Sequence, residues 1–90
     1  MMARTLLKGA EVALPTSAGA GTSFSEATVV RLYNSDTNSH VVSVEETAGG
    51  TGVGSMTLPA GHVEYLEKNP RYTIYADSAT VLGAKVGFTG

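Results

Sequence analysis

The chain of 90 residues contains no cysteine and no tryptophan, and only 16% of its residues are charged. The absence of cysteine excludes disulfide bridges, zinc ribbons and thiol nucleophiles. It also disfavours export, since small secreted domains commonly depend on disulfide bridges. Average globular chains carry about 25% charged residues. A surface low in charge and rich in Gly, Ser and Thr therefore favours contact with other protein surfaces.

Clustered basic residues and long apolar runs are also missing. The formal net charge is −2, and the six Lys and Arg residues are spread along the chain. Without a basic patch to neutralise phosphates, we expect no nucleic-acid partner. The N-terminal stretch MMARTLLKGAEVALP has no apolar run long enough for a signal peptide, and no other segment is long enough to span a bilayer. We therefore expect no membrane association.

Alternation of apolar and polar residues dominates the chain from residue 28 onward. Six strand-like segments follow one another at residues 28–34, 40–46, 53–58, 62–68, 71–77 and 80–89. Turn-forming residues separate them, and no window shows the period of an amphipathic helix. This pattern predicts an all-β fold, a small antiparallel β-sandwich or barrel of about six to eight short strands.

The alternation also predicts which side chains point inward. These are Val30 and Leu32, Val42 and Val44, Met56 and Leu58, Val63 and Tyr65, Ile74 and Ala76, and then Leu82, Ala84, Val86 and Phe88. Gly83 and Gly87 fall on the opposite face, where a glycine marks a bend or a close approach of backbone. The stretch LPAGHVEYLEKNPRYTIYAD reads as a hairpin with Pro70 at its turn, where a missing N–H is tolerated.

The first 27 residues differ from the rest in composition. They include LPTSAGAGTSFSEA, which has high backbone entropy and little apolar surface of its own. We therefore divide the chain into an extended N-terminal arm (1–27) and a β-sandwich domain (28–90). Such an arm is either disordered or held by a neighbour, because ordering each residue costs about 1–2 kcal/mol. The predicted apolar anchors for a partner are Leu6, Leu7, Val12, Leu14 and Phe24.

Three segments superficially resemble reactive or metal-binding motifs. The glycine-rich residues 49–54 precede a strand and lack the lysine of a phosphate-binding loop, so they are expected to form a hairpin loop. Asp36-Thr37-Asn38-Ser39 lacks the glycine and glutamate of a calcium loop and reads as a turn. His62 and Glu64 share a strand face, to which His40 could add, but a zinc site needs at least three converging ligands. We predict no catalytic residues, no cofactor and no bound metal.

Tyrosines are the remaining candidates for contact residues. Tyr33, Tyr72 and Tyr75 include at least one side chain off the apolar face, because Tyr75 is out of phase with Ile74. An exposed tyrosine can stack on a sugar, pack on a neighbouring subunit or pair across strands.

The quoted segments VVRLYNSDTNSHVVSV, GSMTLPAGHVEYLEKNPRYTI and ATVLGAKVGFTG together resemble the small virion structural proteins of tailed bacteriophages, in particular capsid decoration (cement) proteins. The resemblance covers residues 28–90. It implies a non-enzymatic protein, made in the host cytoplasm, that binds the outside of an assembled capsid between major capsid subunits and stabilises the shell. It also implies self-association as a trimer or cluster on the capsid surface of the virion.

Two alternatives stay open at this point. The chain is a head–tail connector or tail protein of the same kind of particle, or it is a carbohydrate-binding or adhesion module that uses Tyr33, Tyr72 or Tyr75 as a stacking platform.

Overall fold

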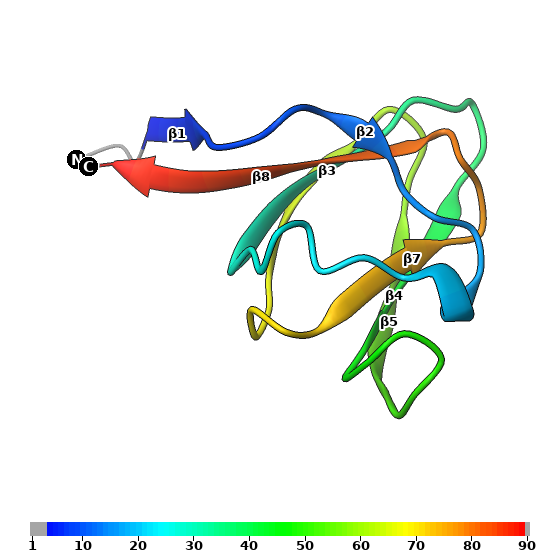
Figure 1. The fold of residues 1–90 in the computed structure, drawn as a ribbon. Helices are drawn as coiled ribbons and strands as arrows, with labels where there is room; N and C mark the ends of the chain where they lie inside the picture. The colour runs from blue at the N-terminus through cyan, green and yellow to red at the C-terminus, as the bar shows by residue number, and fades with distance from the viewer. Residues whose placement is uncertain (1–3, 90) are drawn as a thin grey trace.

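Residues 4–89 are described by a computed structural model of the chain, which is almost entirely β (Figure 1). The strands are β1 (Arg4–Leu7), β2 (Val12–Ala13), β3 (Val29–Asn34), β4 (His40–Glu45), β5 (Gly52–Leu58), β6 (Val63–Glu67), β7 (Thr73–Ala76) and β8 (Val81–Thr89). One turn of 3₁₀-helix, η1 (Ala18–Ala20), lies between β2 and β3. The all-β prediction is confirmed, and the six strands predicted after residue 27 are present as β3 to β8.

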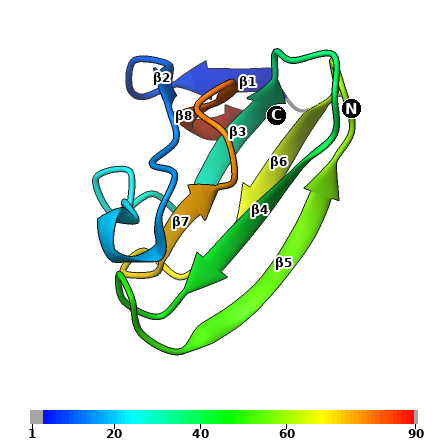
Figure 2. The same cartoon turned by 90° about the vertical axis from the view of Figure 1, so that its right-hand side faces the viewer.

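The strands form two antiparallel sheets that pack as a small β-sandwich (Figure 2). The larger sheet has the order β1-β8-β3-β6, with β2 also paired to β8, and the smaller sheet has the order β5-β4-β7. Successive strands mostly change sheets, so that among the described strands only β4 and β5 form a hairpin within one sheet. The glycine-rich residues 49–54 belong to this hairpin, as predicted, and the glycines open β5 and do not lead into a helix.

The Pro-Ala-Gly turn forms where the sequence predicts it. The amide of His62 donates to the carbonyl of Pro59 at 3.1 Å, and Gly61 adopts a φ of 72°. A positive φ at the third turn position is open to glycine at little cost. The turn directs the chain out of β5 and into β6, which lies in the other sheet.

The predicted hairpin across residues 62–77 is wrong. A turn does form at Pro70, where the amide of Tyr72 donates to the carbonyl of Asn69 at 3.0 Å. However, β6 pairs with β3 and β7 pairs with β4, so the turn carries the chain from one sheet to the other. Alternation within each strand is the same for both topologies, and the sequence pattern therefore does not distinguish them.

The predicted inward face is wrong for Val63 and Tyr65 of β6 and for Leu82 and Phe88 of β8, whereas Ala84 and Val86, also predicted to point inward, are buried at 3% exposure each. Leu32 lies opposite Gly83 and Tyr33 lies opposite Leu82, and directly opposed residues share a face. Val81 and Gly83 therefore face the core beside fully buried Leu32, while Leu82 and Phe88 share the outer face with Tyr33. In β6, Leu66 opposes Val30 and packs on the core, whereas Val63 and Tyr65 point outward. Both strands carry apolar residues on both faces, so the sequence does not show which of the two alternating sets of side chains points inward.

The N-terminal segment supplies part of the core. Leu14 and Phe24 are 2% and 8% exposed and belong to the cluster formed by Val30, Leu32, Val42, Leu58, Ile74, Ala76 and Val81. Both lie over Gly83, where an added Cβ would stand 2.7 Å from Phe24 Cζ and 2.8 Å from Leu14 Cδ1. The sequence predicted a bend or a close approach of backbone at Gly83, on the outer face. The structure instead packs two side chains on Gly83 at the core face, and they come from the segment that the sequence assigned to a separate arm.

Backbone pairing holds the same segment along its own domain. β1 and β2 pair with β8, and the amide of Leu14 donates to the carbonyl of Val81 at 2.9 Å. The amide of Ala76 donates to Pro15, and Thr22 bridges Ile74, so that residues 15–22 cover the edge of β7. Residues 4–27 therefore complete the sandwich and are not a free arm. Residues 1–3 of the predicted arm and residue 90 of the predicted domain lie outside the described part.

A left-handed turn brings Phe24 into the core. Phe24, Ser25 and Glu26 have φ values of 52°, 54° and 57°, a conformation that costs about 1–2 kcal/mol for each non-glycine residue. The buried Phe24 ring contributes about 1.5–3 kcal/mol in return. Each hydrogen bond adds about 0.5–1.5 kcal/mol, and the amides of Glu26 and Ala27 both donate to Ser23. These gains offset the strain.

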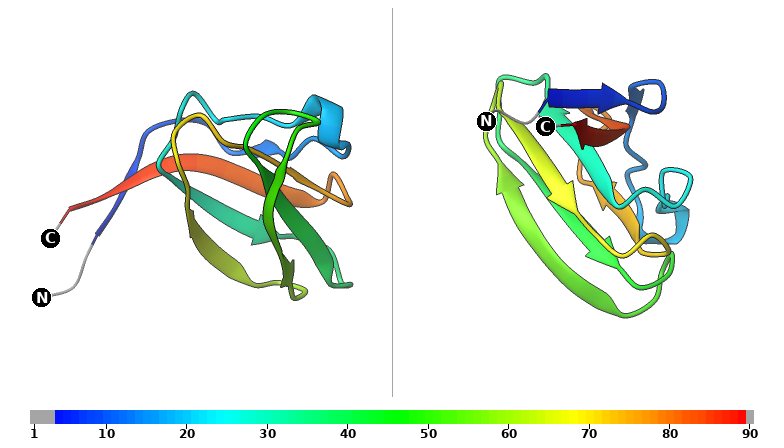
Figure 3. Two further views of the ribbon diagram at one scale, coloured as in Figure 1. Left: turned by 90° about the horizontal axis from the view of Figure 1, so that it is seen from below. Right: turned by 90° about the vertical axis from the view of Figure 1, so that its left-hand side faces the viewer.

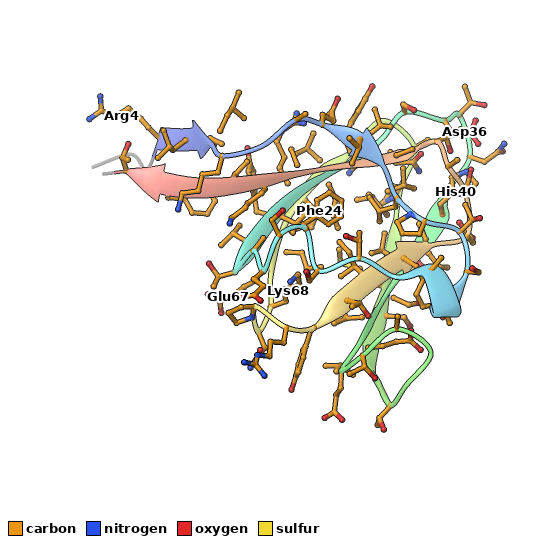
Figure 4. All side chains as sticks on the ribbon, viewed as in Figure 1. Arg4, Phe24, Asp36, His40, Glu67 and Lys68 are labelled. Atoms are coloured by element: carbon orange, nitrogen blue, oxygen red, sulfur yellow. The ribbon has the colours of Figure 1, made fainter. Side chains whose placement is uncertain are left out.

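Two lysines hold the carbonyls of this turn. Lys85 Nζ donates to the carbonyl of Ser25 at 2.9 Å. Lys68, which is labelled in Figure 4, donates from Nζ to the carbonyl of Ala27 at 2.8 Å. Lys68 is only 7% exposed and also donates to the carbonyls of Asn69 and Pro70. Burial and the nearby Lys85 charge lower the pKa of Lys68. Lys68 thus joins the left-handed turn to the β6–β7 connection.

We expect Gly83→Ala to lower the free energy of unfolding by about 1–3 kcal/mol, because the new methyl group overpacks against Phe24 and Leu14. Gly52→Ala is the matched control, since an added Cβ there meets nothing within 4 Å; we expect it to change stability by less than about 0.5 kcal/mol. Urea unfolding followed by circular dichroism measures both. Equal stability of the two variants would contradict the packing at Gly83.

Leu14→Ala is expected to destabilise the fold by about 2–5 kcal/mol, because it leaves a cavity in the core. Leu7→Ala, in the same N-terminal segment but 71% exposed, should cost less than about 0.5 kcal/mol. Thermal and urea unfolding of the two variants test whether the segment belongs to the domain. If Leu14→Ala were as stable as Leu7→Ala, the segment would be an arm after all.

Candidate protein-interaction surface

The outer face of the larger sheet is unusually apolar. We use the term outer face for the residues of β1, β3, β6 and β8 that point away from the smaller sheet. Antiparallel sheets usually present polar residues to solvent, but the exposed side chains here include Leu7, Val63, Tyr65 and Phe88, at 71%, 38%, 43% and 48% exposure. Apolar groups gathered on one sheet face are typical of a surface that another molecule covers.

Tyr65 and Phe88 form an aromatic pair on the outer face. Their ring centroids are 5.2 Å apart with an interplanar angle of 63°, an edge-to-face contact. The Tyr65 hydroxyl and Thr5 Oγ1 are 3.4 Å apart. Hydrogen bonding to Thr5, together with the Arg31 guanidinium, lowers the pKa of Tyr65. The pair joins the end of β8 to β6 across the sheet and presents two ordered aromatic rings to solvent.

One ion pair interrupts the apolar surface. Arg31 Nη1 lies 3.1 Å from Glu11 Oε2, with both side chains partly exposed. Arg31 is central in β3 and lies between Ala84 of β8 and Tyr65 of β6. An exposed pair of this kind contributes about 0–1 kcal/mol to stability. Its place in the outer face gives that surface a polar group of fixed geometry beside the aromatic pair.

The five predicted anchors separate into two groups. Leu6, Leu7 and Val12 are exposed, at 48%, 71% and 49%, and remain accessible to a partner. Leu14 and Phe24 are buried in the core of their own domain and cannot anchor a partner. The sequence shows that a polar segment contains five apolar residues. It does not show that β7 and β8 leave a gap in the core, which Leu14 and Phe24 fill.

The three predicted contact tyrosines do not share a surface. Tyr33 lies half-buried on the outer face, Tyr72 lines a cleft between the sheets, and Tyr75 lies opposite Ser43 on the smaller sheet. Tyr65 and Phe88 were missed, because the alternation assigned both to the core. In both strands the alternate positions are apolar as well, at Leu66 in β6 and at Val81 in β8. Taking these alternate positions as the inward ones would have placed Tyr65 and Phe88 on the outside.

A second polar cluster lies at the other end of the molecule from Arg4, at Asp36 and His40 (Figure 4). His40 Nε2 lies 2.7 Å from Asp36 Oδ2, and His40 Nδ1 lies 2.9 Å from Asp77 Oδ1. The hydrogen bond to Asp36 and the charge of Asp77 raise the pKa of His40. The hydrogen bond from His40 lowers the pKa of Asp36. Residues 36–39 form the predicted turn, and the histidine clamps it to the loop after β7.

The side chains of Asp36, His40 and Asp77 form a structural clamp. In residues 4–89 no group of three or more His, Asp or Glu side chains is placed to hold a metal ion. Asn34, fully buried beside the turn, donates to the carbonyls of Asn38 and Leu58 at 2.9 and 2.8 Å. Its Oδ1 accepts from the amide of Asp36 at 3.0 Å. The turn is therefore held on both sides by side chains.

Comparison with protein-family models, with curated proteins and with solved structures finds no match to this chain. Among residues 4–89 no helix is long and apolar enough to cross a membrane. The class that the fold defines is therefore a small β-sandwich, with an apolar outer face as its candidate site.

The His40 clamp predicts a pH-dependent stability. Because the folded pKa of His40 is raised, its contribution is complete below the ordinary value of 6.5 and is lost as the pH rises through the folded pKa. The lowered pKa of Asp36 means that its contribution is present above the ordinary 3.8 and is lost as the pH falls through the folded value. Stability should therefore be greatest between these limits. Urea midpoints measured from below pH 3.8 to above the folded pKa of His40 should show the loss at alkaline pH in the wild type and in His62→Gln, but not in His40→Gln. The same loss in His40→Gln would contradict the clamp.

Proposed function

We propose that the chain is a non-enzymatic structural protein of a bacteriophage particle that binds the outside of the assembled capsid between major capsid subunits and stabilises the shell. The resemblance of residues 28–90 to capsid decoration proteins supports the choice of particle. The observation that carries the proposal is the apolar outer face with the ordered Tyr65–Phe88 pair. Covering such a face is favourable by about 25 cal/mol for each Å² of apolar area removed from water.

Binding would stabilise the shell by linkage. A protein that binds the assembled lattice better than free subunits shifts the equilibrium toward the lattice. Occupation of many equivalent sites adds the effect over the whole shell. The low charge of the chain suits a short-range contact that depends on shape and apolar area, with little long-range steering.

A head–tail connector or tail protein could use the same face, and copy number distinguishes these roles. Quantitative mass spectrometry of purified particles from the source would compare this chain with the most abundant shell protein. A decoration protein should be present at a simple fraction of the shell protein. A count that fits a single ring would assign the chain to the connector or tail, and absence from particles would contradict the proposal.

We expect Val63→Ser to weaken binding to undecorated particles by roughly tenfold, because it replaces an exposed apolar side chain of the outer face with a polar one. Val41→Ser is the matched control: the same substitution at 40% exposure, against 38% for Val63, on the smaller sheet. Sedimentation of particles with labelled protein measures both affinities. Equal binding by the two variants would exclude the outer face as the contact surface.

A further inference from the structure

A cleft lies between β5 and β6, which run at edges of the two sheets (Figure 3). β5 is the edge of the smaller sheet and β6 is an edge of the larger one, so each has an unpaired side among the described strands. Between them lies a cleft of about 350 Å³ lined by Val44, Gly54, Met56, Leu66, Lys68 and Tyr72, among others. Val44, Met56 and Leu66 pack on the core but stay only partly buried. We call this opening the β5–β6 cleft.

The two strands that border the cleft differ in charge and in their capacity to pair with a further strand. β5, with the sequence GVGSMTL, contains no charged residue and no proline, the residues that usually protect an edge from further pairing. β6 exposes two carboxylates, Glu64 and Glu67, and the latter also lines the cleft. An extended segment with an apolar side chain and positive charge therefore fits this site best, because it would pair its backbone, fill the cleft and neutralise β6.

The chain itself carries a segment with these properties. β1 has the sequence RTLL and is followed by Lys8, so that Arg4 and Lys8 flank exposed Leu6 and Leu7 without an acidic residue between them. β1 pairs with the end of β8 on one side, and its other side has no partner among the described strands. Figure 1 shows β1 and the end of β8 leading away from the body as a two-stranded ribbon, with Arg4 at its tip in Figure 4.

We propose that β1 of one copy of this chain docks along the β5–β6 cleft of a second copy, with Leu6 entering the cleft and Arg4 and Lys8 facing Glu64 and Glu67. The inference goes beyond the proposed function and does not depend on it. A copy cannot fill its own cleft in this way, because β8 and β3 separate β1 from β6 in the sheet. Leu6 shares its face with Gly87, whereas Leu7 shares the outer face with Val86, so the two leucines serve different surfaces.

The contact is head-to-tail, because the donor strand and the acceptor cleft are different parts of the chain. Each copy offers one donor and one acceptor, so the assembly either closes into a ring or continues as an open chain. This property gives a test that an unspecific apolar contact would not pass. A variant that lacks only the donor and a variant that lacks only the acceptor should each be monomeric, yet a mixture of the two should stop at the dimer.

Gly54→Val removes the acceptor without disturbing the fold, because an added Cβ at Gly54 meets nothing within 4 Å and Gly54 lines the cleft. Gly52→Val is its control, since Gly52 has equal space but lies outside the cleft lining. Leu6→Ser removes the donor, and Leu7→Ser is its control on the opposite face. Circular dichroism checks that all four full-length variants are folded.

Analytical ultracentrifugation of the full-length chain measures the result. We expect the wild type, Gly52→Val and Leu7→Ser to self-associate, and Gly54→Val and Leu6→Ser to do so roughly tenfold more weakly or not at all. The mixture of Gly54→Val and Leu6→Ser should form dimers only. Arg4→Glu with Lys8→Glu should weaken the contact, and Glu64→Lys with Glu67→Lys in the partner copy should restore it.

Three results would overturn the proposal. They are a wild-type chain that stays monomeric at millimolar concentration, self-association that Gly54→Val and Leu6→Ser leave unchanged, and a mixture of the two variants that shows no dimer. Loss of particle binding by Val63→Ser concerns the outer face alone, so failure of the proposed function and failure of this contact are separate observations.

Discussion

The close approach of Leu14 and Phe24 to Gly83 is the constraint on which the rest of the structure depends. β8 pairs with β1, β2 and β3, so it holds the larger sheet together. Because Gly83 has no side chain, two large side chains from the N-terminal segment can lie on β8 and close the core. The left-handed turn at residues 24–26 follows from this packing, since it directs the Phe24 ring back onto the strand. Lys68 and Lys85 then bind the carbonyls that the turn leaves exposed.

The same use of the N-terminal segment decides which surfaces stay available to partners. Residues 15–22 cover β7 and leave β5 and β6 as uncovered edges. The β5–β6 cleft lies between these two edges, while the ribbon of β1 and β8 extends from the body elsewhere. The outer face carries a second apolar layer on strands whose inner face is already in the core. A domain of 90 residues with 42% hydrophobic residues thus places apolar groups both inside and on surfaces suited to contacts with other chains.

Much of the local structure could be predicted from the sequence, and most of the long-range structure could not. Period-two alternation and turn residues are local properties, so strands β3 to β8 and the Pro59–Gly61 turn were accessible. The sheet to which each strand belongs depends on contacts between distant residues, and for this reason the predicted 62–77 hairpin was wrong. Tyr65 and Phe88 were assigned to the core because β6 and β8 are apolar on both faces. Leu14 and Phe24 were predicted to anchor the chain on a partner. Composition alone does not show that the core of the same domain has space for these two side chains.

Native-state hydrogen exchange of the full chain tests the central claim most directly. The amide of Leu14 donates to Val81 and that of Thr22 donates to Ile74. If the N-terminal segment completes the core, these amides open only with the whole domain, and their exchange free energies equal those of amides in β3. If they exchange freely while β3 and β8 stay protected, the segment is a detachable arm and the account given of the fold is contradicted.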